Sequence, residues 1–351
     1  MTRIALNGLG RIGKLLLRDL AADGLLDSLV LINEAVGDPA LHAHLLEFDT
    51  VHGRWAADIA HTAEALVLNG HEVRLAGESA LEALPLAGLD VELLIDCTGA
   101  FRTAARLQPA FDAGVERVLV SAPVKSPGAL NLVYGVNHDA YDPDGHRIVT
   151  AASCTTNCLA PVVKVLHEGI GIRHGSITTL HDVTNTQTIV DRPASDARRA
   201  RSALNSLIPT TTGSATAITM IFPELQGRLD GHAVRVPLLN ASLTDCVFEM
   251  RRETTVEEVN GLLEDAAAGA LDGILGYETR PLVSADYVND PRSGVVDALS
   301  TMVVGGTQVK LYVWYDNEWG YACRLGDIAR LLVDAPGARG RHAGGAGPAR
   351  R

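Results

Sequence analysis

A cysteine lies where a predicted strand meets a predicted helix. Residues 153–158 read SCTTNC; a β-rich run ends at residue 150, and residues 159–168 are apolar at helical spacing. Unpaired N–H groups and the dipole at a helix N-terminus favour the thiolate, which is the nucleophilic form of cysteine. The competing interpretation of Cys154 is a small buried apolar side chain. The pattern therefore indicates a candidate nucleophile.

A histidine follows the next predicted strand. Residues 176–180 have strand character and lead directly into His181. A histidine at a strand end can reach a neighbouring thiol, take up its proton, pair with the thiolate and later return the proton. An isolated histidine is more often a surface or hydrogen-bonded core residue. We expect a Cys154–His181 pair if the fold brings the two together.

Several hydroxyl and guanidinium groups follow in the same half of the chain. They are the threonines of residues 184–188, the arginines within 198–201, the hydroxyls of 210–214, and Arg235 within an apolar strand. Arginine and threonine side chains are frequent phosphate donors, and a buried guanidinium needs an anionic partner. The alternative for the arginine run is an exposed helical face paired with nearby aspartates. The set predicts a site for small phosphorylated anions.

The N-terminus carries a glycine-rich turn in the context that a dinucleotide site requires. Residues 8–13 read GLGRIG, directly after an apolar strand and before a helical pattern. Glycines there allow a tight turn, close approach of a pyrophosphate and helix–strand packing. Glu34 ends the second predicted strand, where an acid accepts hydrogen bonds from a ribose and repels a 2′-phosphate, so the pattern favours NAD over NADP. The alternative for Glu34 is a solvated loop charge.

Strands and helices alternate through the first half of the chain. The expected elements are strands at 65–67, 72–75, 91–95 and 117–120, and helices at 41–47 and 103–110. Such alternation predicts a doubly wound, mainly parallel sheet of Rossmann type. The loops 96–101 and 121–125 then lie at its carboxyl edge, where ligands bind.

The second half changes character. Strands are expected at 233–236, 241–250, 301–304 and 309–315, with helices at 255–268 and from about 318 to 334. We predict an α/β protein with an NAD-binding domain, residues 1–153, and an α+β catalytic domain with a large, mostly antiparallel sheet, residues 154–317. The helix 318–334 is expected to pack back onto the first domain, and the Gly/Ala/Arg-rich tail 335–351 to be disordered.

Composition limits the possible functions. The net charge of −12 disfavours nucleic-acid binding, no apolar run is long enough for a membrane span, and no signal segment opens the chain. Five scattered cysteines without a CxxC motif predict reduced thiols in the cytoplasm. No metal site is expected, because Cys154 and Cys158 lack a second ligand pair at zinc spacing.

Motifs along the chain resemble one enzyme family, glyceraldehyde-3-phosphate dehydrogenase. They are NGLGRIG, FDTVHGRW, CTGAF, SAP, YGVNHDAYD, ASCTTNCLAP, PTTTG, RVPLLNAS and WYDNEWGY, in that family's order. ASCTTNCLAP is highly specific, whereas the glycine motif is not. The resemblance implies oxidation of glyceraldehyde 3-phosphate by NAD through a thiohemiacetal and a thioester on Cys154, with His181 as the base.

The resemblance also implies binding roles. Thr184 and Arg235 match the positions that hold the C3 phosphate of the substrate. Thr155, Arg198, Thr212 and Gly213 match positions around the attacking phosphate, and we place Ser153 with them. The expected cofactor contacts are Gly8, Gly10, Arg11, Ile12, Gly13, Glu34, Thr98, Gly99, Ser121, Asn317 and Tyr321. The family is a homotetramer, in which residues 183–205 form a loop near a neighbouring subunit's cofactor.

Some residues depart from the family pattern. The usual Asn-Asp after the second strand is Asn33-Glu34, and Arg192 replaces a frequently apolar residue near the adenosine. The pair after the catalytic histidine is Asp182-Val183 rather than Ala-Tyr or similar, and Thr186 replaces Asp or a small residue. The wording HDVTNTQT resembles a branch associated with arsenate resistance. In that branch arsenate replaces phosphate, and a partner transporter exports 1-arseno-3-phosphoglycerate.

Two alternatives remain at this stage. The sister activity on erythrose 4-phosphate ends in hydrolysis of the thioester instead of phosphorolysis. A non-catalytic NAD-binding regulator is the alternative from another class, and the presence of Cys154, His181, Arg198 and Arg235 speaks against it.

Overall fold

The computed structural model describes residues 1–335 as two compact units. Of the described residues, unit 1 comprises Met1–Leu132, His138–Ala152 and residues 322–335, and unit 2 comprises Val133–Asn137 and Ser153–Tyr321. The tail expected to be disordered lies outside the described residues, apart from Ala335. Within the described part, no helix combines the length and apolar content that crossing a bilayer demands.

Unit 1 contains a nine-stranded sheet in the order β3-β4-β5-β2-β1-β6-β7-β9-β8. All pairings from β5 to β8 are parallel, and only β3–β4 and β4–β5 are antiparallel. The Rossmann-type sheet is confirmed, with an antiparallel edge added. Its strands are β1 (Ile4–Asn7), β2 (Leu29–Asn33), β3 (Ile59–His61), β4 (Ala65–Leu68), β5 (His71–Ala76), β6 (Leu93–Asp96), β7 (Arg117–Val120), β8 (Ala129–Asn131) and β9 (Ile148–Thr150).

The central strands are short apolar runs, as expected of strands covered on both faces. Every residue of β1, β6 and β7 is buried. The carboxyl ends of β1, β2 and β6 therefore lie side by side at one edge of the sheet, where the turns that follow them can form a ligand site.

Helices of unit 1 begin and pack as the local sequence dictates. They are α1 (Arg11–Ala22), α2 (Pro39–Glu47), α3 (Ala104–Asp112) and most of α7 (Trp319–Asp334). Asp38 caps α2 by accepting the N–H of Leu41 at 2.8 Å, directly before a proline at the first helical position. The end of α7 is tied to the rest of unit 1, because Arg330 pairs with Asp19 at 3.1 Å and Arg117 donates to the carbonyl of Leu332.

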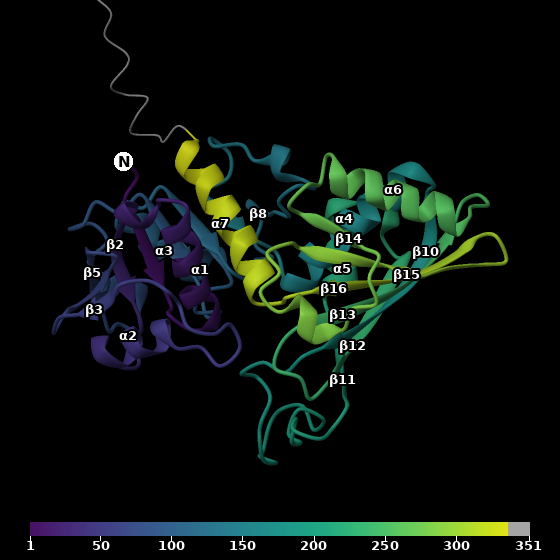
Figure 1. The fold of residues 1–351 in the computed structure, drawn as a ribbon. Coiled ribbons are helices and arrows are strands. Elements are labelled where there is room, and N and C mark those ends of the chain that lie inside the picture. Colours follow the sequence, from purple (N-terminus) through teal and green to yellow (C-terminus); the bar gives the residue numbers. More distant parts are fainter. Residues whose placement is uncertain (336–351) are drawn as a thin grey trace, which may run out of the picture. The chain divides into compact units, whose positions relative to one another are not determined.

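Unit 2 contains a seven-stranded sheet in the order β11-β12-β10-β13-β16-β15-β14. Its pairings are antiparallel except β10–β12 and β14–β15, which confirms a mostly antiparallel sheet. Its strands are β10 (Ile172–His181), β11 (Ile208–Thr211), β12 (Leu229–Arg235), β13 (Ser242–Met250), β14 (Leu275–Glu278), β15 (Gly294–Val304) and β16 (Gln308–Tyr315). Helices α4 (Cys154–Gly169), α5 (Ser214–Ile221) and α6 (Val256–Ala268) pack against one face of it (Figure 1).

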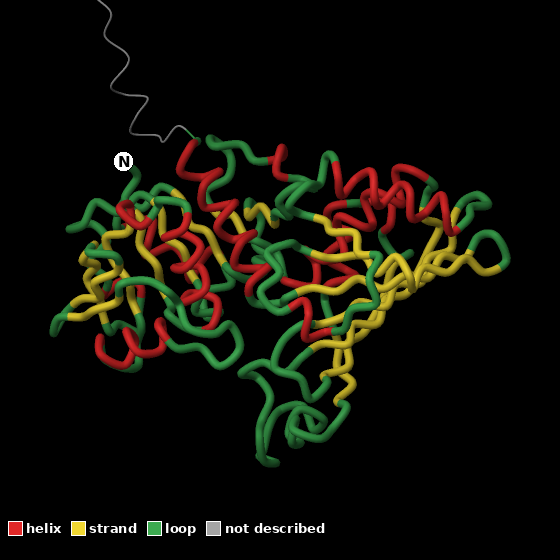
Figure 2. Tube along the Cα trace, viewed as in Figure 1, coloured by secondary structure: helices red, strands yellow, loops and turns green. Residues whose placement is uncertain are grey.

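The chain between β10 and β11 forms a long loop (Figure 2). Residues 198–201, for which a helical face is one interpretation of the sequence, form a turn and the start of a bend instead. Short 3-10 helices occupy Leu26–Ser28, Leu81–Ala83, His138–Ala140, Pro223–Leu225 and Ser284–Tyr287.

Candidate active site

Cys154 is the first residue of α4. Ser153 caps the helix with an extended backbone, and its hydroxyl accepts the N–H of Thr156 at 3.2 Å. The backbone N–H groups of the first turn and the positive end of the helix dipole therefore lie beside the sulfur. Cys154 is partly exposed, so a small molecule can reach it.

His181 ends β10 and meets this sulfur. Its Nε2 lies 3.8 Å from Cys154 Sγ, and its ring is packed edge-on against Tyr315, with ring centroids 6.2 Å apart. The expected cysteine–histidine pair is thus present, formed by residues that lie 27 positions apart in the chain.

The two groups shift each other's acidity. Burial raises the pKa of the Cys154 thiol, but the hydrogen bond and positive charge of His181 lower it, and the net shift is downward. Burial lowers the pKa of His181, whereas Asp182 and Cys154 raise it, and the result is about 9. Opposite shifts of this kind favour a thiolate–imidazolium pair at neutral pH.

The other ring nitrogen of His181 has three polar neighbours. Its Nδ1 lies 2.7 Å from Asp182 Oδ1, 2.9 Å from the backbone carbonyl oxygen of Asp182 and 2.6 Å from Arg235 Nη1. A guanidinium only donates, so its contact is a hydrogen bond only when Nδ1 lacks a proton. The carboxylate accepts, so its contact fits a protonated Nδ1. We favour the protonated form, because the thiolate on the far side of the ring also stabilises the imidazolium.

Two helix N-termini approach each other next to Cys154. The hydroxyl of Ser153, at the start of α4, lies 3.5 Å from that of Ser214, at the start of α5. Thr212 donates its hydroxyl to Ser214 at 3.0 Å, and Gly213 has open space around its Cα. Backbone N–H groups and hydroxyls thus converge as they do in anion sites. Ser214 belongs to the hydroxyl run 210–214 that the sequence predicts as a source of phosphate donors.

Thr155 follows Cys154 in the first turn of α4. Its side chain is buried, and its hydroxyl is 2.9 Å from that of Tyr315 and 4.0 Å from the Cys154 sulfur. Its role toward an attacking anion stays a prediction. Tyr315 was missed from the sequence, because it lies on β16, more than 130 residues beyond the end of β10 along the chain.

Thr184 and Arg198 lie in the loop after β10. The described residues provide no contact of either side chain with Cys154 or His181. The Thr184 hydroxyl donates to Gln187 Oε1 at 3.1 Å. Arg201 pairs with Asp191 at 2.6 Å and Arg199 donates to Thr210, whereas Arg198 forms no ion pair within residues 1–335.

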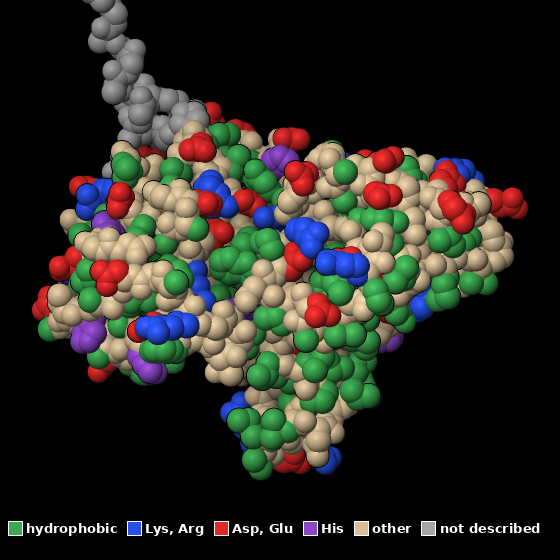
Figure 3. All heavy atoms as spheres, in the orientation of Figure 1, with side chains coloured by type: hydrophobic (Ala, Val, Ile, Leu, Met, Phe, Trp, Pro, Cys, Tyr) green, Lys and Arg blue, Asp and Glu red, His purple; other side chains and the backbone are tan. Residues whose placement is uncertain are grey.

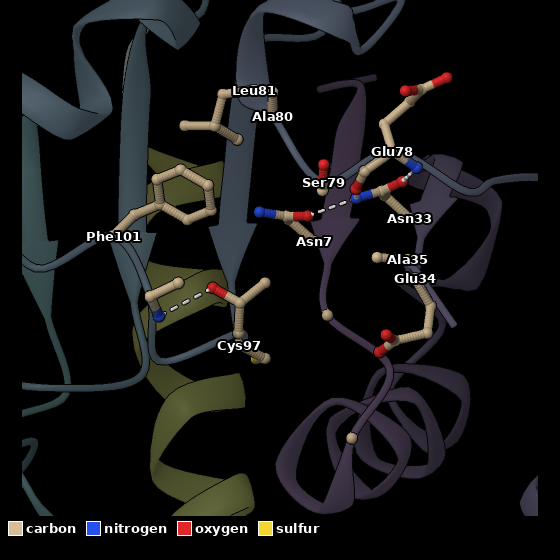
Figure 4. Close-up of a pocket in the computed structure, with 14 residues that line it drawn as sticks. Asn7, Asn33, Glu34, Ala35, Glu78, Ser79, Ala80, Leu81, Cys97 and Phe101 are labelled. Atoms are coloured by element: carbon tan, nitrogen blue, oxygen red, sulfur yellow. Dashed lines mark hydrogen bonds between the residues drawn. The ribbon is translucent and has the colours of Figure 1, made fainter. Parts of the chain in front are cut away.

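Unit 1 has a pocket of about 270 Å³ at the carboxyl ends of β1, β2 and β6. Figure 4 shows Leu81 and the ring of Phe101 on one side of this pocket and Asn33 and Glu34 on the other. The Glu34 carboxylate accepts the N–H of Leu9 at 2.8 Å, so it is joined to the glycine turn. The lining residues are Asn7, Gly8, Gly10, Asn33, Glu34, Ala35, Glu78, Ser79, Ala80, Leu81, Cys97, Thr98, Ala100 and Phe101.

The glycine turn fits a dinucleotide. Gly8 has a φ of +96°, and a Cβ there would lie 2.7 Å from the Thr98 nitrogen. A Cβ on Gly13 would meet the Gly8 carbonyl at 2.0 Å, whereas Gly10 faces open space. The first and third glycines thus allow the turn and the helix packing, and the second leaves the backbone accessible for a phosphate.

The remaining candidate cofactor residues have the following settings. Arg11 forms an ion pair with Asp49, while Ile12 is half-buried in the first turn of α1. Gly99 has a φ of +68°, and the Ser121 N–H donates to the carbonyl of Asp96 at 2.9 Å. In unit 2, the side-chain oxygen of Asn317 lies 3.2 Å from the Ser242 hydroxyl oxygen, and Tyr321 is buried. Their roles toward a cofactor stay predictions.

Cys158 lies one turn after Cys154 and is buried. Its sulfur is 3.1 Å from the Thr244 hydroxyl, in the packing of α4 against β13. Burial raises the pKa of this thiol to about 12, whereas the pKa of Cys154 is lowered.

Comparisons with known proteins agree along both units. Residues 2–104 match a family model described as the NAD binding domain of glyceraldehyde 3-phosphate dehydrogenase, and residues 153–317 match the model of its C-terminal domain. Glyceraldehyde-3-phosphate dehydrogenase 3 of Nostoc sp. is 57% identical over 332 residues, covering 94% of this chain and 98% of that protein. Glyceraldehyde-3-phosphate dehydrogenase 1 of Bacillus cereus is 45% identical over 95% of this chain and 99% of that protein. Glyceraldehyde-3-phosphate dehydrogenase of Geobacillus stearothermophilus is 45% identical over 94% of this chain and 98% of that protein.

Proposed function

The chain belongs to the glyceraldehyde-3-phosphate dehydrogenase family, and on that premise we propose that it oxidises glyceraldehyde 3-phosphate with NAD and passes the acyl group to an inorganic oxyanion. The observation that carries the proposal is the 3.8 Å approach of His181 Nε2 to Cys154 Sγ at the N-terminus of α4. A surface cysteine or a core histidine would not need this arrangement. The residue roles below belong to the proposal.

Cys154 provides the nucleophile. Its thiolate adds to the aldehyde carbon, and the new oxyanion receives hydrogen bonds from the N–H groups at the start of α4 and from His181 Nε2. His181 Nε2 gives its proton to this oxygen, so that the thiohemiacetal carries a hydroxyl and the imidazole is neutral. His181 then takes the hydroxyl proton back as the carbon is oxidised, which leaves a thioester on Cys154. NAD, when bound, supplies the acceptor for the hydride.

The oxyanion completes the cycle. It attacks the thioester carbon, the C–S bond breaks, and Cys154 leaves as the thiolate. With phosphate the product is 1,3-bisphosphoglycerate. Arg235 and Thr184 are proposed to hold the C3 phosphate, and Ser153, Thr155, Arg198, Thr212 and Gly213 the attacking anion. Support for the second set comes from the convergence of the N-termini of α4 and α5 beside Cys154.

NAD is proposed to bind the pocket at the carboxyl ends of β1, β2 and β6. The Gly8–Gly13 turn would receive the pyrophosphate, and Glu34 the adenosine ribose hydroxyls. Support comes from the open space at Gly10 and from the position of Glu34 in the lining of that pocket.

Arsenate is the second candidate oxyanion. It has the charge and nearly the size of phosphate, so one cradle of hydroxyls and arginines suits both. The HDVTNTQT wording favours the arsenate-associated branch, in which the product 1-arseno-3-phosphoglycerate would leave through an efflux transporter. Comparing the turnover of the chain with arsenate and with phosphate at equal concentration distinguishes the two.

We also propose a cytoplasmic homotetramer. Support comes from large apolar side chains that are exposed on the loop after β10 and near it. They are Ile189, Val190, Leu204, Leu207 and Leu239. Hydrophobic patches of this kind commonly mark contacts between chains.

The test of the activity is Cys154→Ser. The variant should lose dehydrogenase activity, because a serine hydroxyl is a weaker nucleophile than the cysteine thiolate. It should keep NAD binding, because residue 154 belongs to unit 2 and the glycine turn to unit 1. Cys158→Ser is the control and should remain active, since its hydroxyl can replace the buried thiol beside Thr244. Full activity of Cys154→Ser would refute the mechanism.

Faster turnover of erythrose 4-phosphate, without a requirement for phosphate, would favour the sister activity. An intact chain that binds NAD and oxidises neither aldehyde would favour the regulator.

A further inference from the structure

The residue after the histidine is a deeply buried carboxylate. Asp182 is 0% exposed, and its Oδ1 lies 2.7 Å from His181 Nδ1. Ser242 of β13 holds it in place, because the serine hydroxyl donates to Oδ1 at 3.2 Å and the Asp182 N–H donates to the serine oxygen at 3.2 Å. Its other oxygen, Oδ2, has no hydrogen-bond partner among the described residues. A buried carboxylate with an unpaired oxygen is costly unless a cation compensates it.

We propose that Asp182 is a positioning residue that completes a cysteine–histidine–aspartate triad. Its carboxylate accepts a hydrogen bond from the Nδ1–H of His181. This contact turns Nε2 toward Cys154 and stabilises the imidazolium. The inference rests on the proposed function in one respect, namely that the Cys154 thiolate is the reacting group. Asp182 does not touch the substrate in this scheme and acts only through the ring.

The location of Asp182 at a strand end makes this contact possible. Side chains of consecutive residues within a strand point to opposite faces. His181 is the last residue of β10, so the chain is free to turn after it, and the two neighbouring side chains meet. Ser242 belongs to a strand that pairs with β10, so it fixes the carboxylate from a rigid element.

Four ionisable groups face His181 from the elements around it. Cys154 of α4 and Asp182 favour the imidazolium, and Arg235 of β12 opposes it through its own charge. Tyr315 of β16 stays neutral, because burial raises its pKa well above the ordinary value. Burial also lowers the pKa of Arg235, but the guanidinium remains a donor that competes for Nδ1. Among the described residues, the Asp182 carboxylate is therefore the negatively charged acceptor at Nδ1, beside the neutral backbone carbonyl of the same residue at 2.9 Å.

Whether Cys154 alkylation slows or speeds when the Asp182 charge is removed distinguishes a triad from a carboxylate that acts on the sulfur directly. Acting directly, a carboxylate near Cys154 repels the thiolate and raises the pKa of the thiol. Acting through His181, it stabilises the imidazolium and hence the thiolate. Removal of the charge speeds alkylation of Cys154 in the first case and slows it in the second. The carboxylate contacts the ring itself, so we expect the second effect to dominate.

The experiment compares Asp182→Asn with the intact protein, without substrate or cofactor. Asparagine keeps the size and removes the charge. Two quantities are measured against pH: the 15N signals of His181, assigned by their loss in His181→Asn, and the rate at which iodoacetamide modifies Cys154. The matched control is Asp230→Asn, which changes an exposed carboxylate on β12 of the same unit.

A triad predicts that the pKa of His181 falls by about one unit or more in Asp182→Asn, which is a tenfold change in its acid constant. Alkylation at neutral pH should slow, and the Asp230→Asn control should match the intact protein in both measurements. An unchanged His181 pKa, or alkylation that is unchanged or faster, would overturn the proposal.

The experiment still tests the triad if the variant does not fold or if the protein does not oxidise the aldehyde. If Asp182→Asn does not fold, the 15N signals of the intact protein decide, because a neutral His181 without a proton on Nδ1 at neutral pH is incompatible with the triad. Neither measurement needs turnover. Failure to oxidise glyceraldehyde 3-phosphate would therefore count against the proposed function and leave the triad standing.

Discussion

At the scale of single residues, the chemistry depends on how one sulfur is surrounded. Cys154, Cys158 and Cys246 are all in unit 2, and burial is the main cause that raises the pKa of the latter two. Only Cys154 has a histidine within hydrogen-bond range, and only its pKa falls. In our proposal, the reactivity of Cys154 therefore depends on the histidine at the end of β10 more than on the helix N-terminus alone.

His181→Asn tests that partnership. The variant loses the general base, which is worth roughly 10²–10⁴-fold in rate. It also loses the positive charge beside the sulfur, so burial dominates and the pKa of Cys154 should rise. In the intact protein the imidazolium is lost only as the pH passes about 9, so the ion pair spans neutral pH.

Steady-state rates and the pH dependence of Cys154 alkylation check this expectation. His174→Asn is a suitable control, because that histidine is exposed on the same strand. A loss of less than about tenfold in rate would contradict the base role, since it falls below the range for such a group.

Glu34 determines the choice of cofactor in our proposal. Glu34→Ala removes the charge that repels a 2′-phosphate, so discrimination against NADP should relax. The same change removes the acceptor for the Leu9 N–H and loosens the glycine turn. Glu34→Gln keeps an acceptor without the charge and separates the two effects. Dissociation constants of NAD and NADP are the measurement, and an unchanged ratio in both variants would show that the ribose contact lies elsewhere.

At the scale of elements, the turn from β1 to α1 contains two glycines, Gly8 and Gly10, that we expect to serve different purposes. Gly8→Ala forces a side chain into the left-handed region, which costs about 1–2 kcal/mol. It also brings a Cβ within 2.7 Å of the Thr98 nitrogen. The substitution should lower the thermal stability of the protein as well as NAD binding.

Gly10→Ala is the matched change, since its added Cβ would meet nothing within 4 Å. It should leave the melting temperature nearly unchanged and weaken NAD binding alone, because the methyl group stands where the pyrophosphate is proposed to bind. Calorimetric melting and cofactor titration of both variants provide the comparison. Equal loss of stability in the two would show that the fold needs both glycines for the same reason.

The elements that the sequence predicts well are those with a clear apolar period. The predicted strand 117–120 coincides with β7, and the helix predicted at 255–268 is one residue longer than α6. Five helices and strands were missed: β11, β14, α5, β3 and β8. The first of these contains a proline and threonines, which read as a polar loop, and it is an edge strand held by β12.

The site was predictable only where chemistry and local pattern coincide. Ser153 and Cys154 are defined by the helix start, and His181 by its strand end. The contacts of Asp182 with Ser242, and of Thr155 with Tyr315, join residues 60 and 160 positions apart. No periodicity in a single sequence encodes such pairs, because they arise from the order of strands in the sheet.

At the scale of the whole molecule, exposed apolar side chains are the main unexplained feature of the surface. Figure 3 shows hydrophobic groups where the chain between β10 and β11 projects. Ile189 is 69% exposed, Val190 73% and Leu204 67%. The same loop contains Arg201–Asp191 and the Thr188–Ser202 bridge, so its shape is internally defined. A shaped loop with an apolar surface suits contact with a second copy of the chain.

Val190→Asp tests this assembly. A charge in a contact between chains must be buried without a partner, so the variant should dissociate into smaller species while each chain remains folded. Light scattering measures the mass, and far-ultraviolet circular dichroism reports the fold. Val304→Asp is the control, since Val304 is 56% exposed at the β15–β16 hairpin.

If the intact protein has the mass of four chains and Val190→Asp retains it, the loop does not hold the assembly together. If the intact protein is itself a single chain, the tetramer is excluded, and the apolar loop must then serve a different contact.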